Sequence, residues 1–440
     1  MSKAEIPGLS IAVIRHGRIQ WVRAFGVKNT KTSEPVTDDT LFQAASLSKP
    51  VFAYGVLKLV DEGRLALDVP LTTYLPYSDV EGDDRLGKIT ARLVLSHRSG
   101  FPNWRGNGKL QIYFTPGERF SYSGEGMIYL QKVVEKITGE RLNDYMTRAV
   151  FQPLGMTSSS YLWRKDYETR IATGYEAGGE PADPWKPDKE SSAASLLTTA
   201  NDYALFVQAV LRGRGLEPST LHEMEKQQVA VDPECIVCTD RAPKELSTNV
   251  FWGLGWGIEM ASNGESIWHW GDNGDFKAFV LASLKDKSGM VFFANSANGL
   301  SIADSLAEEV MGYPQPLFAW TKFDAYDSPA MRFAREAREK GGRAALNDFA
   351  EALNSGAVSE SAVNSVGYSL LRKKLNDDAI LVLQKNVELH PDSANTYDSL
   401  GEAYMDAGQK DLAIKNYERS LELNPKNENG KAMLDKLRKN

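Results

Sequence analysis

The sequence contains few cysteines. Of its 440 residues only two are cysteine, Cys235 and Cys238, and they form a single Cys-x-x-Cys in a loop-like stretch. Two cysteines exclude a four-cysteine zinc site, and a thioredoxin-type redox pair is expected to open a helix after a strand. A local disulfide or two idle thiols therefore fit this stretch better than a redox centre.

Long apolar runs are also absent. No run approaches the roughly 18 residues that a membrane-spanning helix needs, and the start Met1-Ser2-Lys3-Ala4-Glu5 lacks the apolar core of a signal peptide. The sequence therefore predicts a soluble chain without a membrane span. Its location stays open: periplasmic or secreted if an export signal has been removed, and cytoplasmic otherwise.

An excess of positive charge is missing as well. The chain has 51 Lys and Arg against 58 Asp and Glu, a formal net charge of -7. Sequence-independent nucleic-acid binding needs concentrated Lys and Arg, so no nucleic-acid partner is expected. The sequence also lacks a phosphate-binding glycine loop and the second histidine of a zincin helix, so neither a cofactor nor a metal is predicted.

A serine and a lysine are spaced to form a nucleophile without histidine. Ser46-Leu47-Ser48-Lys49 is the only Ser-x-x-Lys in the chain, and the apolar stretch 51–60 that follows predicts a helix. Pro50 is tolerated only in the first turn, which places Ser46 at the helix start. Residues three apart share a helix face, so the Lys49 amine can reach the Ser46 hydroxyl and activate it.

Tyr122 is a candidate proton shuttle. The stretch Phe120-Ser121-Tyr122-Ser123-Gly124 precedes a helical pattern over 126–137, which puts the tyrosine on a loop before a rigid element. Its ordinary pKa of about 10 is too high for a base at neutral pH, but a nearby Lys49 ammonium would favour the phenolate. The alternative is a partly buried tyrosine whose hydroxyl is merely hydrogen-bonded.

The stretch 267–274 reads as a strand that ends in glycines. A backbone N–H at the end of such a strand can serve as one oxyanion donor, with the Ser46 N–H as the other. His269 within it is equally consistent with a packed strand residue.

Strand patterns lie at both ends of a long helical region. A hairpin is predicted over 9–24 and strands over 253–260, 266–270, 277–284 and 290–295, with helices over 51–62, 91–95, 126–137 and 201–211 between them. This order predicts an α+β domain over residues 1–320. Its antiparallel sheet would be built from both ends of the domain and flanked by helices.

A second organisation begins near residue 360. Gly367 recurs as Gly401 and Pro391 as Pro425, each pair 34 residues apart, which is the tetratricopeptide period. We expect two tetratricopeptide repeats plus a capping helix over 360–440, and a helical linker or degenerate repeat over 321–359. Such repeats commonly bind proteins, so a protein partner or self-association is expected.

Several motifs in order resemble one enzyme superfamily. They are Ser46 with Lys49, the stretches 95–102, 122–124, 151–156 and 252–257, and His269-Trp270-Gly271. Over roughly residues 5–315 the chain resembles the serine β-lactamase and penicillin-binding-protein superfamily, especially its class C β-lactamase-like and family VIII esterase-like branch. The resemblance implies a β-lactamase/transpeptidase-like fold in which Ser46 attacks a carbonyl and Lys49 and Tyr122 move protons. It also implies that the N–H groups of Ser46 and Asp272 hold the oxyanion and that water hydrolyses the acyl-enzyme.

Two departures from the β-lactamase pattern concern substrate recognition. Gly124 stands where those enzymes have the Asn of Tyr-x-Asn, so an amide that binds the substrate is missing. His269-Trp270-Gly271 replaces Lys-Thr-Gly, which exchanges a fixed cation for a mostly neutral imidazole. A carboxylate-bearing substrate loses its anchor, while Trp104, Trp268 and Trp270 are candidates to line an apolar pocket.

These departures favour a carboxylesterase that acts on a small-molecule ester or amide, with weak β-lactamase activity beside it. A D-amino-acid peptidase related to penicillin-binding proteins is one alternative. The other is a non-catalytic binding or sensor module whose repeats dock a protein partner.

Overall fold

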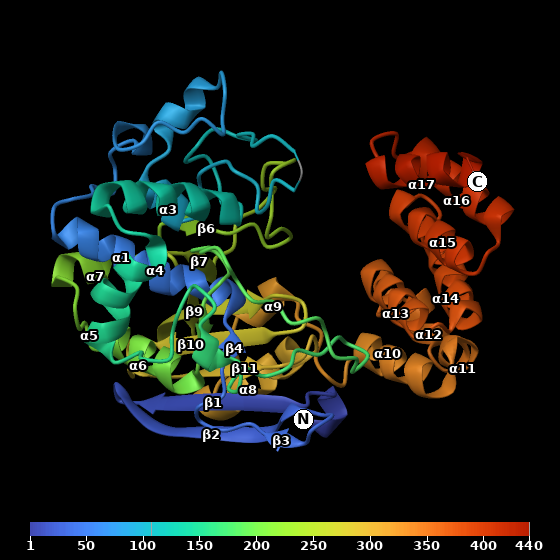
Figure 1. Ribbon diagram of the computed structural model, residues 1–440, viewed down its shortest axis with the longest axis horizontal. Coiled ribbons are helices and arrows are strands. Elements are labelled where there is room, and N and C mark those ends of the chain that lie inside the picture. The colour runs from blue at the N-terminus through green and yellow to red at the C-terminus, as the bar shows by residue number, and fades with distance from the viewer. Residues whose placement is uncertain (107, 440) are drawn as a thin grey trace. The chain divides into compact units, whose positions relative to one another are not determined.

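The computed structural model describes residues 1–106 and 108–439. It divides into two compact units, Met1–Phe323 and Asp324–Asn440. The first unit contains a nine-stranded sheet in the order β3-β2-β1-β11-β10-β9-β8-β7-β6, and every neighbouring pair is antiparallel (Figure 1). Its strands are β1 Gly8–Arg15, β2 Arg18–Asn29, β3 Glu34–Pro35, β6 Val229–Ala230, β7 Val250–Trp252, β8 Gly257–Ala261, β9 Gly264–Asp272, β10 Lys277–Ser283 and β11 Ser288–Ala294.

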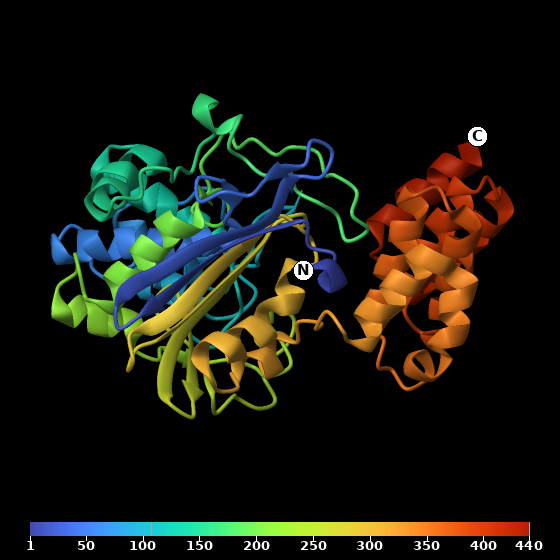
Figure 2. The same ribbon diagram turned by 90° about the horizontal axis from the view of Figure 1, so that it is seen from below.

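The sheet joins the two ends of the first unit. Strand β1 pairs with β2 on one side and with β11 on the other, with Leu9 opposite Ala294 and Val13 opposite Met290. Strand β11 is buried along its whole length because helices cover both faces: α6 (Ala200–Leu211) packs against β1, β2 and β11, and α8 (Ala303–Met311) also packs against β11 (Figure 2). The predicted α+β architecture is confirmed.

The strand predicted over 253–260 is wrong in its first half, because β8 begins only at Gly257. The stretch 253–256 is a tight turn between β7 and β8, in which the Gly253 N–H donates to the Trp256 carbonyl at 2.8 Å. Gly255 has a φ of 86°, and a Cβ there would lie 2.4 Å from the Cβ of Ala53. The turn therefore needs glycine both for its left-handed backbone and for its close approach to the helix that follows Ser46.

The helices of the first unit are short. They are α1 Ser48–Asp61, α2 Ala91–Leu95, α3 Gly124–Thr138, α4 Leu142–Met146, α5 Gln152–Leu154, α6, α7 Pro218–Glu225, α8 and α9 Leu317–Thr321. Within residues 1–106 and 108–439 of the whole chain, no helix has the combination of length and apolar character that crossing a bilayer requires.

The second unit is all helical. Its helices are α10 Pro329–Lys340, α11 Gly342–Asp348, α12 Ala350–Asn354, α13 Glu360–Arg372, α14 Asn376–Leu389, α15 Ala394–Asp406, α16 Lys410–Leu423 and α17 Glu428–Lys439. The pairs α13/α14 and α15/α16 are equivalent: a Cβ at Gly367 would lie 2.6 Å from Leu383, and one at Gly401 would lie 3.2 Å from Tyr417. Phe333 on α10 belongs to the same apolar core, so the helices before residue 360 share the packing of the repeats.

Candidate active site

Ser46 lies in a single 3₁₀ turn, Ala45–Leu47, that runs directly into α1. The preceding strand β4 (Phe42–Gln43) pairs with β5 (Leu197–Thr198) and fixes the start of this turn. Ala45 has a φ of 49°, an uncommon left-handed conformation for a residue with a Cβ. Within residues 41–50 only Ser46 is not fully buried, so the backbone presents its hydroxyl at the surface of an otherwise closed segment.

Lys49 is the immediate partner of Ser46. Its Nζ donates to the Ser46 Oγ at 2.9 Å and to the Ala193 carbonyl at 2.8 Å, as the three-residue spacing predicts for the first of these contacts. The side chain is buried, and this burial lowers the pKa of the amine to about 7. A neutral amine has two hydrogens and one lone pair, so it can donate to Ala193 and still accept the Ser46 proton.

Tyr122 reaches the same place from the segment before α3. Its ring centroid lies 4.8 Å from the Lys49 Nζ, and its hydroxyl lies 3.5 Å from the His269 Nε2. Burial raises the pKa of Tyr122, and a hydrogen bond with Ser46 acts in the opposite direction without outweighing it. The expectation that a Lys49 ammonium would favour the phenolate was therefore wrong, because the burial of Tyr122 outweighs other effects and keeps it a phenol.

Two buried imidazoles flank Tyr122. Burial, and then the charge of Lys49, lowers the pKa of His269 to about 3; its Nδ1 lies 2.7 Å from the Trp270 carbonyl. A hydrogen on Nδ1 satisfies that carbonyl and leaves Nε2 as an acceptor for the Tyr122 hydroxyl. His97 lies on the other side, its ring centroid 4.3 Å from that of Tyr122, and its Nδ1 accepts the Ser123 N–H at 3.0 Å.

The surroundings of His269 and of the end of β9 differ from those expected of a strand that only binds substrate. His269 is fully buried and contacts Tyr122 rather than an open surface. A Cβ at Gly271 would lie 2.3 Å from the Ala44 carbonyl oxygen, so β9 presses against the turn that carries Ser46. The Asp272 carboxylate forms an ion pair with Lys277 and accepts the Gly274 N–H at 2.8 Å. These two contacts hold the side chain in the turn that follows β9.

Gly124 is enclosed by Trp104. A Cβ at Gly124 would lie 2.8 Å from the Trp104 ring and 2.9 Å from the Asn103 carbonyl oxygen. The Trp104 side chain is half exposed, so it forms a lid over the backbone at this point. An asparagine at residue 124 has no room here, and the departure from Tyr-x-Asn is a matter of packing as well as of a lost amide.

The aromatic residues near the site divide into two groups. Trp268 is fully buried and belongs to the interior, while Trp270 is partly exposed with its ring centroid 5.0 Å from that of Tyr122. Of the tryptophans considered as pocket residues, Trp104 and Trp270 therefore remain available to a substrate.

Comparison with known proteins identifies the family. The Beta-lactamase family profile matches residues 1–311, and a Tetratricopeptide repeat profile matches residues 394–427. The chain belongs to the β-lactamase family. Similar folds include a class C beta-lactamase, with a TM-score of 0.60 at 20% identity over 71% of this chain and 92% of that one. The octameric penicillin-binding protein homologue from Pyrococcus abyssi superposes with a TM-score of 0.59 at 22% identity over 76% and 78%.

Two curated relatives of this β-lactamase family member carry different names, Protein flp and Esterase EstB. Protein flp of Staphylococcus aureus (strain MRSA252) is 23% identical over 317 residues, which cover 67% of this chain and 60% of that protein. Esterase EstB of Burkholderia gladioli is 26% identical over 283 residues, covering 52% of this chain and 72% of that protein. The chain thus spans about three fifths of the length of the staphylococcal relative.

In this β-lactamase family member the two cysteines support the Tyr122 segment. Cys235 and Cys238 form a disulfide, and the carbonyl of Ile236 between them accepts the Tyr122 N–H at 2.9 Å. The Cys238 N–H donates to the Ser121 Oγ at 2.9 Å, and the Arg119 Nε donates to the Cys238 carbonyl at 3.2 Å. The disulfide-closed loop therefore holds the backbone on which Tyr122 is mounted.

Sequence reasoning missed two partners of the site, the carbonyls of Ala193 and Ile236. The first lies 144 residues from Lys49 and the second more than a hundred from Tyr122. A backbone carbonyl is present at every residue, so no residue type marks these positions.

Opening the disulfide should loosen the Tyr122 backbone. In a Cys235→Ser variant, amide hydrogen exchange at Tyr122 should accelerate by roughly tenfold, because its acceptor on Ile236 is no longer tied in place and a hydrogen bond is worth about 1 kcal/mol. The adjacent Ser123 amide, bonded to His97, is the internal control and should change less. Equal exchange at Tyr122 in the two proteins would show that the loop does not hold this segment.

Proposed function

We propose that this protein is a serine carboxylesterase that hydrolyses a small-molecule ester through an acyl-enzyme at Ser46. The observation that carries the proposal is the contact of 2.9 Å between the Ser46 Oγ and a buried Lys49 amine with a pKa of about 7. A base with such a pKa is half neutral near physiological pH, where general-base catalysis is most effective. Membership of the β-lactamase family and the similarity to Esterase EstB support the same chemistry.

The proposed acylation begins with proton transfer from the Ser46 hydroxyl to the neutral Lys49 amine. The Ser46 Oγ attacks the ester carbonyl, and the N–H groups of Ser46 and Asp272 are the proposed donors to the resulting oxyanion. Tyr122, a phenol next to Lys49, passes a proton to the departing alcohol and regains one from the lysine. The C–O bond of the ester breaks, the alcohol leaves, and an acyl-serine remains.

Deacylation uses the same groups in reverse. Lys49, neutral again, accepts a proton from water, and the hydroxide equivalent attacks the acyl-serine carbonyl. The bond to the Ser46 Oγ breaks, the serine recovers its hydrogen, and a carboxylic acid leaves. The net reaction is ester plus water to acid plus alcohol.

The recognition groups favour an ester over a β-lactam or a D-peptide. Trp104 occupies the space next to Gly124 where β-lactamases hold an asparagine amide, and His269 is buried and neutral. A substrate carboxylate therefore finds no fixed cation at this strand, whereas an uncharged ester needs none. We therefore propose β-lactam hydrolysis only as a weak secondary activity.

The tetratricopeptide repeats point to protein interaction. Such repeats present helix pairs that commonly bind peptides or other proteins. We propose that the second unit binds a protein partner or mediates self-association.

Removing the nucleophile tests the proposal directly. Ser46→Ala should abolish turnover of p-nitrophenyl acetate and covalent labelling by a fluorophosphonate, because Ser46 is the one hydroxyl among the described residues that accepts a hydrogen bond from Lys49. Ser262→Ala, at an exposed serine, should retain both. Undiminished turnover in the Ser46 variant would refute the proposed chemistry, and labelling without turnover in the natural protein would support the binding or sensor alternative.

The charge of Lys49 should set the pH dependence. The amine acts only when neutral, so kcat/KM for p-nitrophenyl acetate should rise with pH through about 7 and then level off. Lys49→Arg, which stays charged, should lower kcat/KM by roughly 10²–10⁴-fold. Lys58→Arg on the same helix is the matched control, since the Lys58 Nζ bonds the Gly215 carbonyl outside the site. A rate profile that is flat from pH 5 to 9 would contradict the role of Lys49.

A further inference from the structure

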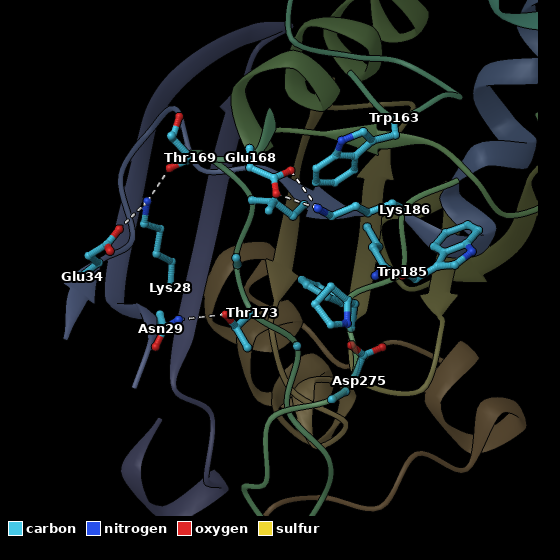
Figure 3. Close-up of a pocket in the computed structure, with 17 residues that line it drawn as sticks. Lys28, Asn29, Glu34, Trp163, Glu168, Thr169, Thr173, Trp185, Lys186 and Asp275 are labelled. Atoms are coloured by element: carbon cyan, nitrogen blue, oxygen red, sulfur yellow. Dashed lines mark hydrogen bonds and ion pairs between the residues drawn. The ribbon is translucent and has the colours of Figure 1, made fainter. Parts of the chain in front are cut away.

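A cavity of about 400 Å³ lies next to β2 and β3 of the first unit (Figure 3). Lys28, Asn29 and Glu34 from β2 and β3 form one side, and Trp163 and Trp185 form the other. This volume lies in the range of small-molecule sites, which combine an apolar lining with a few polar groups. The exposed Trp185 indole provides a flat apolar surface for a ring.

A smaller cavity of about 210 Å³ lies next to this space. Gln43, Trp185 and Asp275 line both cavities, so the two are neighbours. The smaller one is also lined by Ala194 and Asn273. Ala194 follows the residue whose carbonyl binds Lys49, and Asn273 follows the proposed oxyanion residue, so the lining of this cavity includes sequence neighbours of groups at the reacting centre.

The charged groups of the larger cavity are unevenly paired. The Lys28 Nζ lies 2.7 Å from Glu34 and the Lys186 Nζ lies 2.7 Å from Glu168, so each cation is neutralised by a carboxylate. The Lys186 ammonium also lies over the Trp163 ring, 4.8 Å from its centroid. Each lysine therefore already has a carboxylate partner in this cavity.

Asp275 differs from these carboxylates because it forms no ion pair with any of the described residues. Its carboxylate bonds its own backbone N–H. The nearby cation Lys277 is already paired with Asp272. A Cβ at Gly174 would lie 1.8 Å from the Asp275 Oδ2, so a glycine is required where this carboxylate is seated.

We propose that this pair of cavities binds the distal end of the ester substrate, and that it selects an aromatic arm carrying a protonated amine, with Asp275 as the counter-ion. The inference rests on the proposed function and specifies its substrate class. The ring lies against Trp185, because the Lys186 ammonium already covers the Trp163 ring, and the ammonium of the substrate donates to the Asp275 carboxylate. A partly buried, unpaired carboxylate favours a cation over a neutral group and disfavours an anion.

A set of esters tests the proposal. One series consists of p-nitrophenyl esters of an aryl-propanoic acid whose ring carries a para aminomethyl, ethyl or carboxymethyl group. A second series carries the same rings on the alcohol side of an acetate ester, which shows the arm that enters the cavity. In one of the two series kcat/KM should favour aminomethyl over ethyl by roughly tenfold, the strength of a charged hydrogen bond, and carboxymethyl should be poorest.

Asp275→Asn should remove this preference while leaving p-nitrophenyl acetate turnover unchanged. Asp304→Asn, an aspartate on α8 outside both cavities, should keep the preference. Trp185→Ala should raise KM for the aryl esters alone. A preference that is absent from both series, or that survives Asp275→Asn, would overturn the proposal.

Binding separates this proposal from the esterase assignment. By calorimetry, phenylpropylammonium should bind the full-length natural protein roughly tenfold more tightly than the Asp275→Asn variant. If no ester is turned over but this difference holds, the proposed reaction fails and the amine site stands. If esters are turned over and the difference is absent, the amine site fails alone.

Discussion

Burial of the Lys49 amine is the constraint on which the rest of the site depends. The side chain leaves water to lie between the Ser46 hydroxyl and the Ala193 carbonyl, and its pKa falls from 10.5 to about 7. A shift of this size corresponds to a cost on the order of 5 kcal/mol for the charged form. Because the folded-state pKa is lowered, this cost weighs fully on stability below pH 7 and disappears as pH rises toward 10.5. The lowered pKa leaves part of Lys49 neutral, so that it can act as a base beside the Ser46 hydroxyl.

Three distant segments have to meet around that amine. The turn before α1 supplies Ser46, the segment before α3 supplies Tyr122, and β9 presses its glycine against the turn. The sheet built from both ends of the first unit brings β9 to this position. The disulfide loop around Ile236 and the carbonyl of Ala193 then fix the tyrosine and the lysine from the side. Supports of this kind hold reacting groups in place while they act.

The parts of the site that follow from local geometry could be predicted from the sequence. The contact of Ser46 with Lys49 follows from their spacing on a helix, and the α+β order follows from hydrophobic patterns. The approach of Tyr122 came from family resemblance, since no spacing rule joins residues 76 positions apart. The neutral state of Tyr122 was missed because it depends on burial, and the 253–256 turn was missed because Gly255 reads as an ordinary strand glycine. The acceptor carbonyls have no side-chain signature at all.

The central claim is that Lys49 titrates near pH 7 in the folded protein, so that a large share of it is a neutral base at physiological pH. Its charge can be read from the chemical shifts of isotopically labelled lysine in a pH titration, assigned by comparison with Lys49→Arg. We expect one lysine to titrate with a midpoint near pH 7, with its signal absent from the variant. A Lys49 signal that keeps the shift of a charged amine up to pH 9 would contradict the claim.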